Sequence, residues 1–387
     1  MKKVFLKTFG CQMNLRDSEV VAGLLQKSGY KVIDSPEKAD VVIFNTCSVR
    51  QHAEDKVWSE IGRLSKVNKP RATAFELKPI IGIVGCMAQN YKDTVFRRSP
   101  GVDFVIGPAD IDKIPRVVEK LTAVNRGLAN SDLYAMKIWE TDGQERPEVI
   151  YHTGFHEDKN HAYVVISEGC SNYCSYCVVP YVRGSLRHRS RADILTEIKE
   201  AIDKGITEIT LLGQNVNAYC DNEVNFVGLL KLVNSIRGLK EFSFITSHPK
   251  DTSADLFQAM AELRKLKKYL HLPAQSGSDR ILGLMNRGYT RKFYLDLADD
   301  YRKIVKGGIL TTDIIVGFPT ETDEDFRQTY GLVDQIQFDV AYIFKYSPRP
   351  HTEAERLNDD VPRPDKEKRH KLILDLQRQI SKKKPKL

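Results

Sequence analysis

A sixfold alternation of short apolar runs and helical patterns, which begins at Ala162, constrains the fold of this 387-residue chain more than any other feature. The apolar runs predict strands over Tyr163–Ser167, Glu208–Leu212, Glu241–Thr246, Tyr269–Leu272, Leu310–Val316 and Val340–Tyr346. Apolar residues at helical spacing occupy Ala192–Lys204, Phe226–Arg237, Ser253–Leu266, Arg291–Val305 and Thr322–Gln335. Right-handed crossovers curl such a run into a barrel. Six units instead of eight predict a partial (β/α)6 barrel with one open side.

Residues 1–125 predict a separate α/β domain with an open parallel sheet. Its strand runs are Val4–Phe9, Val41–Asn45, Ile80–Val84 and Asp103–Ile106, and its helical patterns are Asp17–Ser28 and Ala53–Leu64. Residues 126–160 lose both patterns and contain turn signals, which predicts a linker. We therefore expect the barrel over residues 161–360 and a basic C-terminal segment over residues 361–387.

Basic charge is concentrated in two places. The net charge is +8, and Arg363–Leu387 holds ten Lys and Arg against three Asp and Glu. A second basic run, which contains no acid, comprises Arg183, Arg187, Arg189 and Arg191. Local basic clusters favour RNA as a partner, because phosphate contacts come from Lys and Arg. A solvated helix and a flexible end remain the alternative. No apolar run approaches the ~18 residues of a membrane span, so we expect a cytoplasmic protein with no membrane contact.

The sharpest motif is Cys170-x3-Cys174-x2-Cys177, which follows the first predicted barrel strand. Barrel active sites are built at that end of the strands. Three thiolates on one loop can hold three irons of a four-iron cube and leave the fourth open to a cofactor. Structural zinc usually takes four protein ligands, and no second closely spaced cysteine pair exists. Zinc and unliganded cysteines remain as alternatives.

Three further cysteines each follow a predicted strand of the N-terminal sheet. Cys11, Cys47 and Cys86 are 36 and 39 residues apart. Because the carboxyl ends of parallel strands share one edge, we expect these thiols to converge and form a second three-thiolate site. Chance burial of single cysteines is the alternative. Cys220 has no such neighbours, and we interpret it as structural.

Together these segments resemble the radical S-adenosylmethionine (SAM) methylthiotransferase family over nearly the whole chain. The first three cysteines lie in Thr8-Phe9-Gly10-Cys11-Gln12-Met13-Asn14, Asn45-Thr46-Cys47-Ser48-Val49-Arg50 and Gly85-Cys86-Met87-Ala88. The resemblance continues through Glu168–Gly184, Leu211–Asn217, His271–Ser278, Met285–Tyr289 and Thr312–Pro319. Members usually end in a small RNA-binding β-barrel (TRAM), which we expect to be absent because the sequence ends near Lys386.

The resemblance implies a transferase that methylthiolates N6-isopentenyladenosine at position 37, in the anticodon loop of tRNA. It implies two [4Fe-4S] clusters, one on Cys170, Cys174 and Cys177 that cleaves SAM to a radical, and one on Cys11, Cys47 and Cys86 that supplies sulfur. A second SAM would provide the methyl group. An electron donor such as flavodoxin or ferredoxin and a sulfur donor are implied as partners. Threonylcarbamoyl-adenosine in tRNA, a ribosomal protein, or a non-catalytic iron–sulfur protein that binds RNA are the alternatives.

Further candidate residues follow from their positions in the predicted barrel. We expect Gln275, Ser276, Thr312 and Asp313 to line a SAM pocket, with ordinary strand-end polar groups as the alternative. The four arginines Arg183, Arg187, Arg189 and Arg191 follow the cysteine loop. We expect them to contact the backbone of the anticodon loop, because RNA recognition targets splayed loops through phosphate and stacking contacts.

Overall fold

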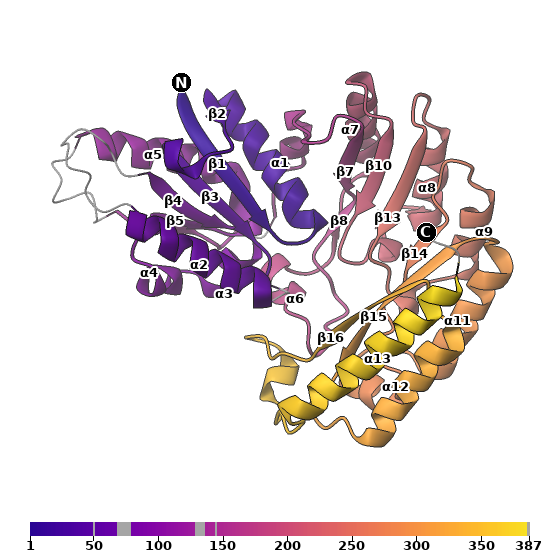
Figure 1. Cartoon of the computed structure of the whole chain (residues 1–387). Coiled ribbons are helices and arrows are strands. Elements are labelled where there is room, and N and C mark those ends of the chain that lie inside the picture. Colours follow the sequence, from indigo (N-terminus) through magenta and orange to yellow (C-terminus); the bar gives the residue numbers. More distant parts are fainter. Residues whose placement is uncertain (49–50, 68–78, 128–135, 144, 385–387) are drawn as a thin grey trace. The chain divides into compact units, whose positions relative to one another are not determined.

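The computed structural model describes residues 1–48, 51–67, 79–127, 136–143 and 145–384, and the chain forms two compact units (Figure 1). Unit 1 comprises Met1–Lys159 together with Tyr181–Gly184. Unit 2 comprises Asn160–Pro180 and Ser185–Leu387. Each unit has its own sheet and its own apolar core.

Unit 1 is built on a six-stranded parallel sheet with strand order β2-β1-β3-β4-β5-β6. The strands are β1 (Lys2–Phe9), β2 (Tyr30–Val32), β3 (Val41–Thr46), β4 (Ile80–Val84), β5 (Phe104–Ile106) and β6 (Ile138–Glu140). All six residues of β3 are buried, as expected for a parallel strand that helices cover on both faces. The four predicted strands are all present.

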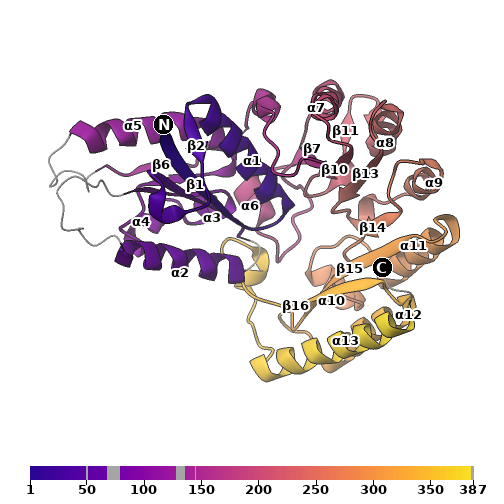
Figure 2. The same ribbon diagram turned by 45° about the horizontal axis from the view of Figure 1, so that its top comes forward.

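Helices cover both faces of this sheet (Figures 1 and 2). One face carries α1 (Gln12–Lys27) and α5 (Ile114–Gly127), and the other carries α2 (Gln51–Val67), α3 (Cys86–Tyr91) and α4 (Thr94–Arg98). Short 3-10 turns complete the unit at η1 (Pro36–Lys38), η2 (Pro108–Lys113) and η3 (Glu148–Thr153). The open parallel-sheet domain predicted from the sequence is therefore confirmed.

The prediction of a linker over residues 126–160 is wrong for the residues of this range that the structure describes. Strand β6 extends the sheet beside β5, and η3 packs against α1. Arg16 holds this segment, because its buried guanidinium donates to the backbone oxygens of Tyr151 at 2.8 Å and Phe155 at 3.3 Å. The hydrophobic pattern misses the segment because β6 is short and only half buried, and because polar contacts fix η3.

Unit 2 contains the six predicted barrel strands, in two parallel three-stranded sheets. The first sheet holds β7 (His161–Val165), β10 (Glu208–Leu212) and β13 (Glu241–Ile245), and the second holds β14 (Tyr269–His271), β15 (Ile309–Val316) and β16 (Val340–Lys345). Two short antiparallel pairs join β8 (Ser167–Glu168) to β9 (Arg187–His188) and β11 (Cys220–Asp221) to β12 (Val224–Asn225).

The helices of unit 2, apart from the short α10 (Asp279–Leu284), pack on one side of these strands (Figure 2). The others are α7 (Arg191–Asp203), α8 (Phe226–Ser235), α9 (Ala254–Glu262), α11 (Arg291–Ile304), α12 (Asp323–Ile336) and α13 (Arg363–Lys383), with short turns η4 (Val216–Ala218), η5 (Pro249–Asp251) and η6 (Glu353–Arg356). Helix α6 (Val179–Arg183) begins in unit 2 and ends in unit 1. The partial barrel is confirmed.

The basic C-terminal segment is an ordered helix and not a solvated end as far as Lys384. Helix α13 packs against β16 and α12. Arg369 is 7% exposed and pairs with Glu321 at 3.1 Å, and Lys384 pairs with Asp339 at 2.7 Å. Part of the positive charge counted in this segment is therefore used inside unit 2.

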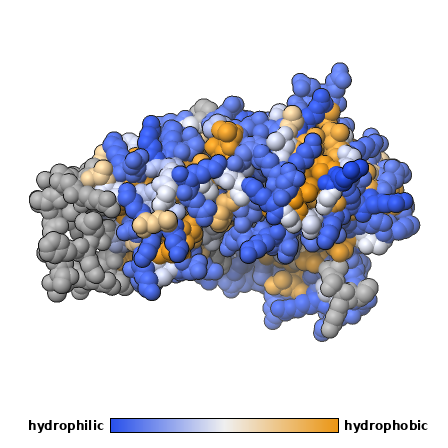
Figure 3. Space-filling model, turned by 90° about the horizontal axis from the view of Figure 1, so that it is seen from above, coloured by the Kyte–Doolittle hydropathy of each residue, from blue (hydrophilic) through white to orange (hydrophobic). Residues whose placement is uncertain are grey.

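The outer surface is mainly polar. Hydrophilic residues cover most of the face drawn in Figure 3, and hydrophobic residues appear there as small separate patches. Within the described residues, no helix combines the length and apolar character needed to cross a membrane.

Candidate functional site

The structure places Cys11, Cys47 and Cys86 at one edge of the unit 1 sheet, as predicted. They follow β1, β3 and β4, which are neighbours in the sheet. The strand register pairs Phe9 with Thr46 and Asn45 with Val84, so the three strands end nearly level. The sequence therefore brings three thiols from distant segments to one place.

Direct contacts join these thiols to one another and to their surroundings. The Cys11 and Cys47 side chains hydrogen-bond to each other. The Cys11 thiol also donates to Oδ1 of Asn14 at 3.4 Å. Nε of Arg183 donates to Sγ of Cys86 at 3.3 Å. Sequence reasoning missed this contact, because it interpreted Arg183 as part of an exposed basic run.

Two asparagines and a glycine hold the cysteine backbones in place. Nδ2 of Asn14 donates to Oδ1 of Asn45 at 3.1 Å, and Nδ2 of Asn45 donates to the backbone oxygen of Asn14 at 2.8 Å. Gly85 has a φ of +88°, and a Cβ atom there would lie 2.3 Å from Oδ1 of Asn45. Only glycine tolerates both the left-handed backbone and this close approach. The segment before Cys86 is thus fixed against β3.

Cys11 and Cys86 differ in how readily they ionise. The hydrogen bond from Cys47, aided by the charge of Arg183 and opposed by burial, lowers the pKa of Cys11 to about 6. Burial raises the pKa of Cys86, although Arg183 partly offsets it. Because metal ligands must be thiolates, metal binding at this site is coupled to proton release.

The second trio lies on one loop of unit 2. Cys170, Cys174 and Cys177 follow β8 and precede α6, at the carboxyl end of the first barrel strand. The backbone amide of Cys177 donates to the backbone oxygen of Cys174 at 2.9 Å, which folds the loop back on itself. Gly169 and Tyr173 adopt left-handed φ angles of 74° and 46° at the turns of this loop.

A buried arginine, which sequence reasoning also missed, supports this loop. Arg287 is 4% exposed, and its Nη1 donates to Sγ of Cys174 at 3.3 Å and to the hydroxyl of Tyr176 at 3.4 Å. Its Nη2 donates to the backbone oxygen of Pro273 at 2.8 Å, and its Nε donates to the hydroxyl of Tyr289 at 3.0 Å. One cation therefore ties the cysteine loop to the carboxyl end of β14.

Burial disfavours the thiolate form of two of the loop thiols, Cys170 and Cys177. Burial raises the pKa of Cys177 to about 12, and it also raises the pKa of Cys170. A negative charge on the nearby Cys174 sulfur would raise both pKa values further. A bound metal ion deprotonates a coordinating thiol outright, so this environment fits a metal-loaded site better than a free nucleophile.

Both trios fit an iron–sulfur cube better than a single metal ion. Among the described residues, no group of three or more His, Cys, Asp or Glu side chains converges closely enough to hold one ion. A four-iron cube takes its thiolates on different iron atoms, so its ligands need not meet at a point. Each trio also has an arginine that donates to a sulfur, and such hydrogen bonds are typical of iron–sulfur sites.

Two of the four predicted SAM residues have hydroxyl groups that the fold uses. The hydroxyl of Thr312 is fully buried, donates to the backbone oxygen of Leu272 at 3.0 Å and accepts from the amide of Ala274 at 2.9 Å. Oγ of Ser276 lies 3.2 Å from Oγ1 of Thr329 on α12. These contacts show that the hydroxyl groups of Thr312 and Ser276 serve the fold, as the alternative of ordinary strand-end polar groups expects. Gln275 and Asp313 remain candidates.

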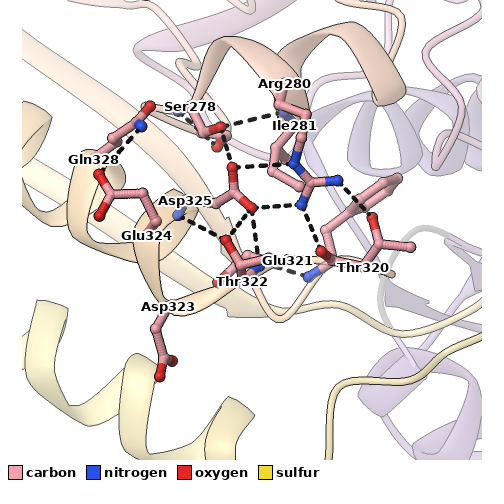
Figure 4. A network of polar contacts seen from close by, with 12 residues as sticks. Ser278, Arg280, Ile281, Thr320, Glu321, Thr322, Asp323, Glu324, Asp325 and Gln328 are labelled. Atoms are coloured by element: carbon pink, nitrogen blue, oxygen red, sulfur yellow. Dashed lines mark hydrogen bonds and ion pairs between the residues drawn. The ribbon is translucent and has the colours of Figure 1, made fainter.

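The segment after Ser276 is fastened to α12 by the network in Figure 4. Asp325 accepts from Oγ of Ser278 at 2.6 Å and from Oγ1 of Thr322 at 2.6 Å, and these two residues are the N-caps of α10 and α12. Arg280 bonds to Asp325 and donates to the backbone oxygen of Thr320 at 2.5 Å. The contacts fix the carboxyl ends of β14 and β15 relative to each other.

The face of the second sheet opposite its helices is polar and partly exposed. Alternate residues of β14, β15 and β16 pack into the apolar core, so the intervening side chains lie on the other face. There Nδ1 of His271 lies 2.9 Å from Oγ1 of Thr311, and Nε2 lies 3.4 Å from Oδ2 of Asp313. Tyr342 stands edge-on to His271 and is 48% exposed. This part of the face therefore presents partly exposed polar and aromatic groups.

Comparison with known proteins follows the division into two units. The Uncharacterized protein family UPF0004 matches residues 3–107, and the Radical SAM superfamily matches residues 164–333. A Moorella thermoacetica protein named tRNA-2-methylthio-N(6)-dimethylallyladenosine synthase is 41% identical over 379 residues, which cover 97% of this chain and 82% of that protein. The chain belongs to this synthase family. Proteins of the same name from Geobacter sulfurreducens and Thermoanaerobacter sp. are 41% and 43% identical over 382 residues, with 82% and 78% of their lengths covered.

Solved structures show the same fold at low sequence identity. The radical S-adenosylmethionine methyltransferase TsrM from Kitasatospora setae, with tryptophan substrate and a SAM analogue bound, matches with a TM-score of 0.62 and 14% identity. The match covers 92% of this chain and 75% of that chain. The cobalamin-dependent radical enzyme OxsB, with aqua-cobalamin bound, matches 99% of this chain and 56% of its own at a TM-score of 0.58 and 13% identity. The synthase family member described here is thus a radical SAM enzyme in fold as well as in sequence.

The basic run after the cysteine loop is mostly committed to the protein. Arg189 is 5% exposed, and its Nη1 donates to Glu197 at 2.5 Å and to the backbone oxygen of Val165 at 2.6 Å. Arg183 is likewise buried beside Cys86. Neither can reach phosphate without losing these contacts, so the expectation of RNA contact is corrected for both. Arg187 and Arg191 are half-buried and remain candidates.

Proposed function

We propose that this chain transfers a methylthio group to C2 of N6-isopentenyladenosine at position 37 of tRNA. The observation that carries the proposal is the presence of two separate three-thiol sites in one chain. Attaching a methylthio group requires both a C–H activation step and a sulfur source, so two sites suit this reaction. The names of relatives at 41% identity over nearly the whole chain support the same substrate.

The reaction explains why iron–sulfur cofactors are needed. The C2–H bond of adenine is not acidic and has no adjacent leaving group, so acid–base or nucleophilic side chains offer no easy route. With [4Fe-4S] clusters and SAM bound, the cofactors supply the radical that removes the hydrogen, the sulfur atom and the methyl group. The protein then has to bind, orient and shield the reacting groups.

In this proposal, Cys170, Cys174 and Cys177 ligate the cluster that uses SAM, and Cys11, Cys47 and Cys86 ligate the cluster that provides sulfur. Arg287 orients Cys174 and links the cluster loop to the end of β14. The raised pKa of Cys177 means that loading this site releases protons. Gln275 and Asp313, at the neighbouring strand ends, bind SAM.

The target base binds on the polar face of the second barrel sheet. The exposed rings of Tyr342 and Phe344 offer stacking surfaces, and His271 offers a hydrogen-bonding group beside Tyr342. Stacking on aromatic side chains is the usual way in which proteins hold single-stranded RNA bases. Arg187 and Arg191 contact the phosphates of the anticodon loop.

Three further components complete the proposed reaction in the cytoplasm, where tRNA is modified. An electron donor such as flavodoxin or ferredoxin would serve the site that Cys170, Cys174 and Cys177 form. A sulfur donor would serve the site that Cys11, Cys47 and Cys86 form. A second SAM provides the methyl group.

The test uses the reconstituted chain with SAM, a reductant and three tRNA preparations, which carry isopentenyladenosine, threonylcarbamoyl-adenosine or unmodified adenosine at position 37. Mass analysis of digested nucleosides should find the 2-methylthio product only with the isopentenyl tRNA. A 2-methylthio product found only with the threonylcarbamoyl-adenosine tRNA would refute the assignment of isopentenyladenosine as the substrate. If the reconstituted protein forms no 5′-deoxyadenosine with any of the tRNA preparations, the proposal that it is an enzyme is refuted. A non-catalytic RNA-binding protein would then be favoured.

A further inference from the structure

The segment after the Cys170 loop joins unit 1 for four residues. Tyr181–Gly184 belongs to unit 1, while the chain on both sides belongs to unit 2. Arg183, at the end of α6, has a side chain that is only 3% exposed. Burying a guanidinium costs free energy unless hydrogen bonds and opposite charges compensate it. The contacts of Arg183 therefore indicate what this segment does in unit 1.

Arg183 bridges a thiol and a carboxylate. Its Nε donates to Sγ of Cys86 at 3.3 Å, and its Nη2 donates to Oδ2 of Asp17 at 2.5 Å. Oδ1 of Asp17, which is 1% exposed, accepts from Nη1 of Arg146 at 2.7 Å. Because Asp17 is held from both sides, it fixes the plane of the Arg183 guanidinium against the sulfur.

The guanidinium of Arg183 places its positive charge directly beside a sulfur of the trio, because its Nε lies 3.3 Å from Sγ of Cys86. Hydrogen bonds and nearby positive charge stabilise negative charge on sulfur, and they set the reduction potential of iron–sulfur clusters. Groups in this position typically change metal affinity by about 10- to 100-fold.

We propose that Arg183 is a positioning residue for the cluster on Cys11, Cys47 and Cys86, and that it makes this cluster easier to reduce and harder to lose. Asp17 and Arg146 serve to orient Arg183. The inference rests on the proposed cluster at these cysteines. It assigns Arg183 to the sulfur-providing site instead of to RNA.

The test isolates the cluster of unit 1. The background is a full-length chain in which Cys170, Cys174 and Cys177 are changed to Ala. In this background, the variants Arg183→Gln and Arg183→Lys are compared with the protein that retains Arg183. A redox titration followed by electron paramagnetic resonance should give a more negative midpoint for Arg183→Gln. A chelator titration should show an iron affinity lower by about 10- to 100-fold for Arg183→Gln and by less for Arg183→Lys, which keeps the charge but not the two-point geometry.

Two matched controls separate this effect from general damage. Arg187→Gln changes an arginine of unit 2 four residues further on and should leave the midpoint and the iron affinity unchanged. In a chain with Cys11, Cys47 and Cys86 changed to Ala, Arg183→Gln should not alter the cluster on Cys170. Equal shifts in both clusters would overturn the assignment.

The remaining outcomes are also decisive. Unchanged midpoint and iron affinity in Arg183→Gln would overturn the inference. Circular dichroism shows whether Arg183→Gln folds. If it does not fold, the iron affinity of Arg183→Lys tests the inference instead, and an affinity equal to that of the wild type would overturn the inference. Neither measurement uses tRNA, so a failure to methylthiolate would refute the proposed function alone. A chain with Arg183 intact that binds no iron at Cys11, Cys47 and Cys86 would refute both.

Discussion

Replacing Gly277 by Ala should destabilise unit 2, because the turn after Ser276 passes directly over α12. A Cβ atom at Gly277 would lie 2.5 Å from the backbone oxygen of Gln328 and 2.7 Å from Cα of Thr329. These are backbone atoms of a helix, which cannot rotate away. Inserting a methyl group into such a packed contact costs about 1–3 kcal/mol. The same turn carries the amide that donates to Oγ1 of Thr329 at 3.0 Å, so the displacement would also strain that bond.

Gly283→Ala is the matched control. Gly283 lies on α10, six residues further on, and a Cβ atom there would meet nothing within 4 Å. Alanine is favoured over glycine inside a helix by about 0.5–1 kcal/mol, so this variant should be slightly more stable than the wild type. Urea unfolding of the cluster-free protein measures both, through shifts of the midpoint at unchanged slope. Equal midpoints for the two variants would refute the close packing of Gly277 on α12.

Three other substitutions test the sites. Cys174→Ala should lower reconstituted iron by about one cluster and stop reductive SAM cleavage, so wild-type formation of 5′-deoxyadenosine would contradict the ligand assignment. Changing Arg187 and Arg191 together to Ala should flatten the slope of log K for tRNA against log salt by about 1.4 to 1.8 units if both meet phosphate, and an unchanged slope would exclude them. Burial, with the charges of Arg287 and Lys250, lowers the pKa of His248 from 6.5 to about 2. The folded cluster-free protein should therefore lose up to about 1.4 kcal/mol of stability per pH unit as pH falls below 6.5, and His248→Gln should reduce that loss in urea unfolding.

The periodic part of the fold follows from the sequence, because strands and helices of an α/β protein bury one face or both. All six barrel strands and four strands of unit 1 lie where apolar runs predict them. Strand β6 and turn η3 do not, because they are short and held by polar contacts such as those of Arg16. A hydrophobic pattern carries no information about that kind of contact.

The positions of the cysteines also follow from the sequence, because strand ends in a parallel sheet share an edge. The residues that contact these cysteines cannot be predicted in the same way. Arg183 and Arg287 lie 97 and 113 residues from the cysteines they contact, and nothing in their local sequence marks them as buried. The residues next to Arg189 in the sequence do not distinguish it from an exposed arginine. Its side chain is nevertheless buried and pairs with Glu197. Charge runs are visible in a sequence, whereas the burial of each charge depends on tertiary packing.

The direction of a strand side chain is a further feature that must be considered beside sequence position. Thr312 and Asp313 are adjacent in β15 and therefore lie on opposite faces of the sheet. Thr312 bonds to the backbone of the turn after β14, and Asp313 lies beside His271 on the polar face. Sequence position alone placed both in one pocket.

The central claim is that two cysteine sites divide the reaction between them. The most direct measurement follows 5′-deoxyadenosine and methylthiolated nucleoside together, with isopentenyl tRNA, for the reconstituted wild type and for a chain with Cys11, Cys47 and Cys86 changed to Ala. The account predicts that the triple variant still cleaves SAM but forms no 2-methylthio product. A triple variant that methylthiolates tRNA over many turnovers would contradict it.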